Sequence, residues 1–265
     1  MKYTFCSQTD PGRIRHNNED SVAVDETNRL AILADGMGGY NAGEIASSMA
    51  TALIMSELGG WLLQASEQSP ITDLGRAIET SVASANRAIF DASRSNPHCA
   101  GMGTTLVLAA FRERQLLLGH VGDSRCYRLR GKEFVQITRD HSLLQEQLDA
   151  GWLTPAQALS SPIRNLITRA MGVADEVLLE LNEHQVLAGD LYLMCSDGLS
   201  DMVQDTEMAD LLRQRSPLQK MAHDLISKAN ENGGRDNVTV LLAQASDQTE
   251  KPRLISKWLR KSGIS

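Results

Sequence analysis

Four apolar runs of strand length follow one another in the middle of this 265-residue chain, and only short polar turns separate them. They cover residues 104–111, 115–121, 125–129 and 134–137. Consecutive short strands joined by tight turns are typical of an antiparallel meander. Because a sheet of this kind must bury at least one face, the runs favour a layered fold.

Helical patterns lie on both sides of this strand-rich segment. Apolar residues recur at helical spacing over 43–58, again after Thr72, which we expect to cap a second helix, and again after Ser216-Pro217. Shorter strand patterns cover 21–25 and 30–34, which we expect to form a hairpin, and 191–195 and 238–242. We therefore predict an α+β fold, a β-sandwich of two mostly antiparallel sheets flanked by helices in a four-layer αββα arrangement.

The composition excludes several classes of protein. No apolar run approaches the roughly 18 residues that a membrane span needs, and the N-terminus has no apolar stretch like that of a signal peptide. We therefore expect no membrane span and a cytoplasmic location. The 4 cysteines include no CxxC pair, which argues against a zinc ribbon or a redox motif and favours small core hydrophobes.

The charge is unevenly distributed along the chain. The formal net charge is −7, although five basic residues and no acid follow Glu250, so the body before them is more acidic still. An acidic body disfavours nucleic-acid binding, because a phosphate backbone requires a basic surface. We predict a domain over residues 1–245 and a basic tail over 246–265. The tail also spaces Leu254, Ile255, Trp258 and Leu259 at helical intervals, so it could touch a membrane surface or an acidic partner, although a docked or frayed helix fits better.

Acidic residues fall at the ends of the predicted strands. The four sites are Glu19-Asp20, Asp35-Gly36, Asp197-Gly198 and Asp236-Asn237. Any one of them alone would be an ordinary turn pair. Four together could converge at one edge of a sandwich, and Mg²⁺ and Mn²⁺ prefer carboxylate and water oxygens. Glycine after an aspartate also lets a backbone carbonyl approach the metal.

Six short motifs make the pattern specific. In chain order they are Arg15-His16-Asn17-Asn18-Glu19-Asp20-Ser21, Asp35-Gly36-Met37-Gly38-Gly39, Gly101-Met102-Gly103-Thr104-Thr105, Gly122-Asp123-Ser124-Arg125, Cys195-Ser196-Asp197-Gly198-Leu199 and Gly234-Arg235-Asp236-Asn237. From about residue 4 to 242 the chain resembles the metal-dependent type 2C protein phosphatases, and among them the compact stand-alone bacterial members. The resemblance implies an enzyme that hydrolyses phosphoserine and phosphothreonine on proteins with two Mn²⁺ or Mg²⁺ ions.

The resemblance also implies a role for each matching residue. Asp35 would bridge the two metals, and the Gly36 carbonyl would complete one shell. Asp197 and Asp236 would be further direct ligands, and Glu19 and Asp20 would bind metal directly or through water. Asp123 would share a third, weaker metal with Asp197, and Arg15 would grip the substrate phosphate. A bridging hydroxide activated by the metals would attack phosphorus in line, without a phosphoenzyme.

Two features of the sequence leave alternatives open. Where many eukaryotic relatives have a histidine proposed as the general acid, this chain has Met37, so water or another residue must protonate the leaving group; His16 and His141 are nearby in motif terms. Residues 139–173 match the variable flap of bacterial members. This helical insertion could select substrates or be a passive surface excursion.

Three functional hypotheses follow. The first is a monomeric phosphatase that acts on phosphorylated proteins and opposes a bacterial serine/threonine kinase, in some bacteria a regulator of secretion. The second is a phosphatase of the partner-switching type, which acts on an anti-sigma antagonist. The third is a catalytically weak phosphoprotein-binding module, which loss of the metal aspartates would favour, but this chain retains all of them.

Gly36-Met37-Gly38-Gly39 is no dinucleotide fingerprint, because Asn41 occupies the place of the third glycine.

Overall fold

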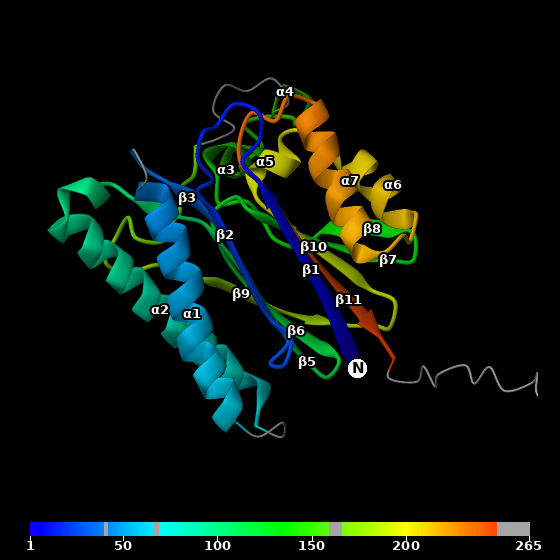
Figure 1. The fold of residues 1–265 in the computed structure, drawn as a ribbon, viewed down its shortest axis with the longest axis horizontal. Helices are drawn as coiled ribbons and strands as arrows, with labels where there is room; N and C mark the ends of the chain where they lie inside the picture. The colour runs from blue at the N-terminus through cyan, green and yellow to red at the C-terminus, as the bar shows by residue number, and fades with distance from the viewer. Residues whose placement is uncertain (40–41, 66–68, 159–165, 248–265) are drawn as a thin grey trace, which may run out of the picture.

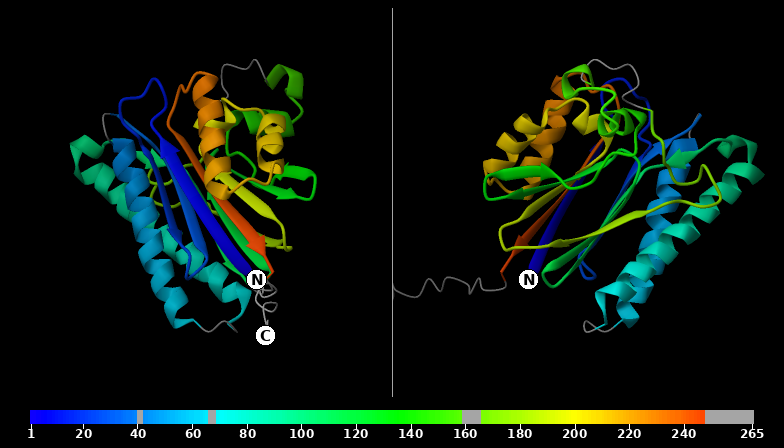
Figure 2. Two further views of the ribbon diagram at one scale, coloured as in Figure 1. Left: turned by 45° about the vertical axis from the view of Figure 1, so that its right-hand side comes forward. Right: turned by 180° about the vertical axis from the view of Figure 1, so that it is seen from behind.

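The computed structural model of the chain is a sandwich of two antiparallel sheets between two layers of helices (Figure 1). It describes residues 1–39, 42–65, 69–158 and 166–247. Two further views separate the layers: α1 and α2 cover one outer face, and α5, α6 and α7 cover the other (Figure 2). The helices are α1 (Ala42–Gln64), α2 (Ile71–Ser95), α3 (Leu143–Asp149), α4 (Pro155–Ala158), α5 (Asp197–Ser200), α6 (Asp205–Arg213) and α7 (Leu218–Glu231).

Each sheet has strands from both halves of the chain. The first sheet has the order β1 (Lys2–Asp10), β11 (Val238–Ser246), β10 (Leu191–Cys195), β7 (Arg125–Arg130) and β8 (Glu133–Gln136). The second has the order β2 (Asp20–Asp25), β3 (Leu30–Met37), β5 (Leu106–Arg112), β6 (Gln115–Val121) and β9 (Glu180–Gln185), with β4 (Gly103–Thr104) beside β3. The predicted α+β sandwich is therefore confirmed.

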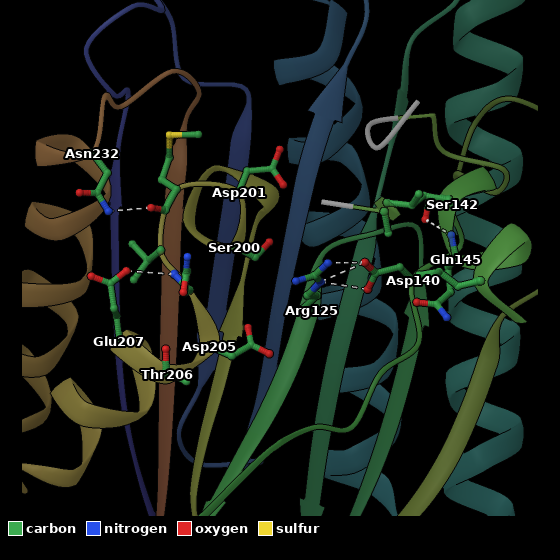
Figure 3. Close-up of a pocket in the computed structure, with 16 residues that line it drawn as sticks. Arg125, Asp140, Ser142, Gln145, Ser200, Asp201, Asp205, Thr206, Glu207 and Asn232 are labelled. Carbon is green, nitrogen blue, oxygen red and sulfur yellow. Dashed lines mark hydrogen bonds and ion pairs between the residues drawn. The ribbon is translucent and has the colours of Figure 1, made fainter. Parts of the chain in front are cut away.

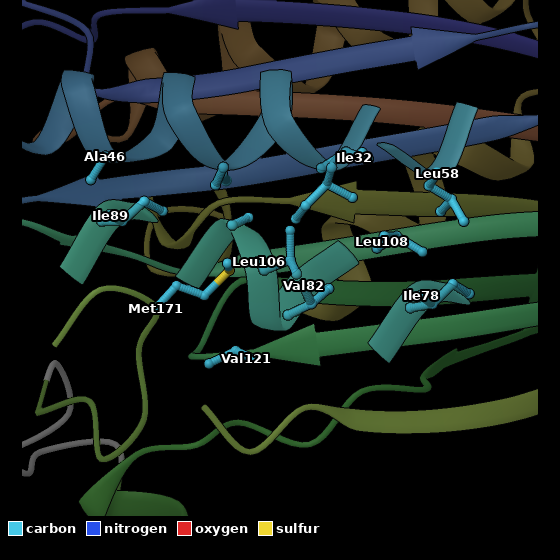
Figure 4. Packing of buried hydrophobic residues seen from close by; sticks show 14 of the residues in the cluster. Ile32, Ala46, Leu58, Ile78, Val82, Ile89, Leu106, Leu108, Val121 and Met171 are labelled. Carbon is cyan, nitrogen blue, oxygen red and sulfur yellow. The ribbon is translucent and has the colours of Figure 1, made fainter. Parts of the chain in front are cut away.

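The alternation of side chains along β3 explains how the layers are held together. Leu30 and Ile32 point to the core under α1 and α2, whereas Ala31 and Leu33 point to the core between the sheets. Since successive residues of a strand face opposite sides, a run that is apolar throughout can serve two cores at once. Both α1 and α2 pack with one apolar stripe on this sheet (Figure 4).

A third core lies under the other helices. It joins α6 and α7 to the outer face of β10 and β11, with Leu193, Val240, Met208 and Leu225 among its buried side chains. Two of the cysteines, Cys126 and Cys195, are fully buried on neighbouring strands and unbonded, as predicted for core hydrophobes.

Several local predictions were wrong or incomplete. The expected meander is broken between β6 and β7, because β6 pairs with β5 and β9 in one sheet while β7 pairs with β8 and β10 in the other. Thr72 lies inside α2 and does not cap it; the N-cap is Pro70. The strands β1 and β9 and the helix α6 were not predicted.

The flap and the tail are described in part. Within the flap, α3 and α4 are helical and lie beside α5 (Figure 1), whereas 159–165 and most of the predicted tail, 248–265, lie outside the described residues. Among the helices of the described ranges, none combines the length and the apolar character that crossing a bilayer requires.

Candidate metal centre

The carboxylates predicted to bind metal meet at one edge of the sandwich. Asp20 begins β2 and lies opposite Asp35 on β3, so the hairpin register sets these two side chains against each other. Asp197 begins α5 directly after β10, and Asp236 precedes β11. Asp35 and Gly36 lie within β3, which runs to Met37, rather than after it as predicted.

The pKa shifts of these side chains indicate that they are close neighbours. Burial raises the pKa of Asp35 well above its usual value, and Asp20, Asp197, Asp123 and Asp236 raise it further. Burial likewise raises the pKa of Asp20 to about 6 and that of Asp197 well above the usual value. Like charges that share a site and have lost water hold protons unless a cation replaces them.

Asp123 lies in the turn after β6, close enough to the carboxylate cluster to interact electrostatically with it. Burial and the nearby Asp140 raise the pKa of Asp123 to about 6. Its charge in turn raises the pKa of Asp197. The structure therefore brings Asp123 to the side of the cluster that Asp197 occupies.

The donor set fits divalent cations. All of the clustered side chains offer carboxylate oxygens, the ligands that Mg²⁺ and Mn²⁺ prefer. Within the described residues, Oδ1 of Asp20 is buried and has no hydrogen-bond partner, while Oδ2 accepts a bond of 2.8 Å from the Ser196 hydroxyl. A buried carboxylate oxygen without a donor is costly, and a metal ion at this position would remove that cost.

Gly36 allows three segments to meet at the cluster. Its N–H donates to the Glu19 carbonyl at 3.1 Å. A Cβ at residue 36 would overlap the Gly43 carbonyl oxygen at the start of α1 and would crowd the Glu19 carbonyl as well. Only glycine therefore permits β3, the Glu19 backbone and α1 to approach so closely.

Asn237 braces the loop that carries Arg15 and Glu19. Its side-chain Oδ1 accepts from the Glu19 N–H at 2.8 Å, and its Nδ2 donates to the carbonyls of Pro11 at 3.0 Å and Asn17 at 2.8 Å. Asn237 belongs to a sequence motif of the family, but this bracing role was not predicted from the sequence. Its position could have suggested the role, because an amide side chain directly after the metal-binding candidate Asp236 is well placed to hold a neighbouring loop.

Arg15 lies against the carboxylate cluster and forms an ion pair with one of its members, Asp236. Its Nη2 is 2.7 Å from Oδ2 of Asp236, and the two side chains are 52% and 35% exposed. The hydrogen bond to Asp236 is the main cause that raises the pKa of Arg15. The guanidinium is therefore at the open side of the carboxylates, where a phosphate would enter.

The two histidines considered as general acids differ in position. His16 is exposed on the loop between β1 and β2. His141 is only 6% exposed, and both of its ring nitrogens have partners in the protein, so it does not face the substrate side.

A groove of about 660 Å³ opens beside the cluster, between the flap and α5–α6 (Figure 3). The flap contributes Leu144, Gln145 and Leu148, and the facing wall includes Asp201, which raises the pKa of both Asp123 and Asp197. At its base the Arg125 guanidinium binds both carboxylate oxygens of Asp140, which neutralises that pair.

Comparisons with known proteins identify this arrangement. A family model described as protein phosphatase 2C matches residues 13–243. The serine/threonine phosphatase Stp of Listeria monocytogenes is 39% identical over 254 residues, which cover 93% of this chain and 97% of that protein. The crystal structure of PstP from Mycobacterium tuberculosis has a TM-score of 0.85 at 40% identity and covers 93% of this chain and 100% of that one.

Two further solved structures extend the comparison. The catalytic domain of PstP in complex with two manganese ions has a TM-score of 0.81 at 40% identity and covers 92% of this chain and 99% of that one. PppA of Pseudomonas aeruginosa, described as a key regulatory component of T6SS, has a TM-score of 0.79 at 33% identity over 92% of this chain and 98% of that one.

The fold and the carboxylate edge define a metal-dependent phosphatase. The chain belongs to the protein phosphatase 2C family. The predicted activity, a metal-dependent serine/threonine phosphatase that uses Mn²⁺ or Mg²⁺ and acts on phosphoproteins, is thereby confirmed.

Proposed function

We propose that Asp35, the Gly36 carbonyl, Asp197, Asp236, Glu19 and Asp20 hold two divalent cations, and that Asp123 with Asp197 holds a weaker third. The observation that carries this assignment is the convergence of the carboxylates at one edge of the sandwich, where Asp20 lies opposite Asp35 and the pKa values of Asp20, Asp35 and Asp197 are all raised. Asp123 stands at the periphery of that cluster, as a weaker site would.

The residues divide the chemical work between them. The bound ions supply a water of lowered pKa as the nucleophile and neutralise charge on the phosphoryl group. Arg15 exchanges its bond with Asp236 for the phosphate and orients it with two parallel N–H groups. Met37 has no transferable proton and His141 is buried, which leaves the exposed His16 and solvent water; we propose that water protonates the leaving serine or threonine oxygen. The half-buried carboxylates leave the pocket open to that water.

Substitution of the central acids tests the assignment. Asp35→Asn and Asp236→Asn should each remove most of the phosphate release from a phosphothreonine peptide. Asp73→Asn, on α2 and away from the cluster, is the matched control and should retain activity. Wild-type turnover by Asp35→Asn would contradict the two-metal assignment.

The groove beside the cluster supports a role for the flap. We propose that residues 139–173 form one wall of the site that takes the peptide around the phosphorylated residue. Leu148→Glu should then lower kcat/KM for a phosphopeptide while leaving that for p-nitrophenyl phosphate, which is too small to reach the groove. Equal losses for both substrates would indicate a passive flap that matters only for folding.

The physiological setting is inferred from the relatives. We propose a monomeric enzyme in the cytoplasm, with a catalytic domain over residues 1–245 and a basic tail over 246–265, that opposes a serine/threonine kinase. The similarity to PppA supports a link to secretion control. Retention of all the acids argues against the alternative of a binding module. Loss of phosphothreonine from a kinase incubated with the protein and Mn²⁺ would support the pairing, and persistence of the label would contradict it.

A further inference from the structure

His120, His141 and Glu180 form a second cluster with the composition of a metal site. One ligand atom from each lies within 4.8 Å of the others. The two imidazole rings stack with centroids 4.5 Å apart. His120 is 1% exposed, and its Nδ1 is buried without a partner among the described residues. The cluster lies at the base of the flap, outside the carboxylate centre.

The hydrogen bonds nevertheless argue against a metal here. The Gly122 N–H donates to Nδ1 of His141 at 3.2 Å, so the neutral ring carries its proton on Nε2. That nitrogen donates a hydrogen bond to Oε2 of Glu180 at 3.3 Å, and Nη1 of the Arg169 guanidinium lies 3.4 Å from the same nitrogen. A cation would therefore meet an N–H and a positive charge where it needs a lone pair.

The same bonds attach His141 to the loop that carries Asp123. Besides the side-chain bond, the His141 N–H donates to the Gly122 carbonyl at 2.9 Å, so one residue holds both polar groups of Gly122. Burial and the adjacent His120 lower the pKa of His141, which keeps Nδ1 able to accept. The loop is thus fixed on its flap side.

The opposite side of the loop is fixed to the metal cluster. Gly122 has φ +104°, and a Cβ there would lie 2.7 Å from Cγ2 of Thr105, so the loop has no room to move that way. The Thr105 hydroxyl accepts from the Asp35 N–H at 2.9 Å and bonds to the Ser124 hydroxyl at 2.8 Å. Asp123 is therefore held between Asp35 and His141.

His141 also joins the two ends of the flap. Its carbonyl accepts from the Thr168 N–H at 2.8 Å, and Ser142 bridges to Ile167 next to it. We propose that His141 is a positioning residue that sets Asp123 for the weaker metal and links that site to the flap. Glu180 fixes the tautomer that this role requires. The inference rests on the proposed function of Asp123.

A pair of near-isosteric substitutions separates the two ring nitrogens. The Asn side-chain oxygen is as many bonds from Cα as Nδ1 is, and the Gln amide is as many bonds away as Nε2 is. His141→Asn therefore retains an acceptor for the Gly122 N–H, whereas His141→Gln and His141→Ala lose it. Phosphothreonine-peptide hydrolysis would be measured over a range of Mn²⁺ concentrations, with calorimetry to count the tightly bound ions.

We expect His141→Gln and His141→Ala to keep two tight ions but to need about 10-fold more Mn²⁺, or more, for the weaker activating step. His141→Asn should stay close to wild type. Asp123→Asn serves as the reference for complete loss of the weaker activating step. Hydrogen exchange of the Gly122 amide gives a second readout that does not depend on activity: slow in wild type and His141→Asn, fast in His141→Gln.

Two results would overturn the inference alone: the same Mn²⁺ dependence in wild type and His141→Gln, or equal impairment of His141→Asn and His141→Gln. Absence of Mn²⁺-dependent hydrolysis in the wild-type protein would instead refute the proposed function on which the inference rests.

Discussion

Arg15 Nη2 lies 2.7 Å from Oδ2 of Asp236, so the group proposed to bind phosphate is paired with a carboxylate proposed to bind metal. Both side chains are partly exposed, and an ion pair of this kind contributes only about 0–1 kcal/mol. The pair is therefore easily exchanged. If Asp236 binds a metal as proposed, the Arg15 guanidinium would be released to bind the phosphate, and substrate binding would be coupled to metal binding.

Removal of this guanidinium should weaken substrate binding without the loss of either tight metal ion. Arg15→Ala should lower kcat/KM for a phosphothreonine peptide by about 10-fold or more, since a hydrogen bond to a charged group contributes about 1.5–3 kcal/mol. Two tight Mn²⁺ ions should still bind in calorimetry. Arg13→Ala, two residues away on the same exposed loop, is the matched control. Equal losses in both variants would show that general positive charge, and not the Arg15 fork, is what matters.

The pH dependence of stability should change sign with metal. The pKa values of Asp20 and Asp123 are raised to about 6 in the folded protein from 3.8, so their contribution to stability is full below pH 4 and is lost as the pH rises through 6. The pKa values of Asp35 and Asp197 are also raised, so these two groups act in the same direction. In EDTA, the cluster should therefore destabilise the protein at pH 8 relative to pH 5. In saturating Mn²⁺ it should have the opposite effect, because protons compete with the metal.

The variant Asp35→Asn isolates this effect from other groups. His141 and His184 have lowered pKa values and act in the opposite direction, since the unfolded chain binds their protons more readily. Asp35→Asn removes a buried like charge, so in EDTA at pH 8 it should melt several degrees above wild type. A lower melting temperature for the variant under those conditions would contradict the proposed repulsion.

Loss of the Asn237 amide should loosen the Arg15 loop. Asn237→Ala leaves the Glu19 N–H and the Pro11 and Asn17 carbonyls without their partner, so we expect a loss of about 1–3 kcal/mol in the free energy of unfolding and weaker Mn²⁺ binding. Asn232→Ala is the comparison, because Asn232 is exposed and its amide makes one bond, to the Met202 carbonyl. Denaturant unfolding and calorimetry would measure both quantities, and a larger loss in Asn232→Ala would be the opposite of what the structure requires.

A methyl group at residue 36 should disrupt the centre. In Gly36→Ala the new Cβ overlaps the Gly43 carbonyl oxygen, so β3 and α1 must separate and Asp35 must shift. We expect loss of most activity and a lower melting temperature. Gly39→Ala adds the same methyl two residues after Met37, where no heavy atom of the described residues beyond its chain neighbours lies within 4 Å of the new Cβ, and should behave as wild type. Normal activity in Gly36→Ala would show that the close approach of the β3 and α1 backbones is not required for the metal centre.

Local patterning was sufficient for the layered architecture. The apolar run from Leu106 to Phe111 indicates a strand that is buried on both faces, and the helical stripe from Ala46 to Leu58 indicates a helix with one face on the core, so sequence indicates both the element and the layer. The acids were predictable for a related reason: Asp197 follows the end of β10 and Asp35 lies near the end of β3, and these strand ends meet at one edge.

The remaining features depend on contacts between distant segments. Nothing in the turn between Val121 and Arg125 indicates that the chain changes sheets there, because each strand alone would fit either sheet. The role of Asn237 follows from carbonyls more than 200 residues earlier in the chain, and that of His141 from a turn 19 residues away. Such side chains look like ordinary polar residues until the fold brings their partners to them.

Hydrolysis of a phosphothreonine peptide by the purified chain, with Mn²⁺ added and with the metal removed by EDTA, tests the central claim most directly. The carboxylate centre predicts phosphate release in Mn²⁺, none in EDTA, and recovery when excess Mn²⁺ is restored. Release that persists unchanged in EDTA, or no release in either Mn²⁺ or Mg²⁺ from protein shown to be folded, would contradict it.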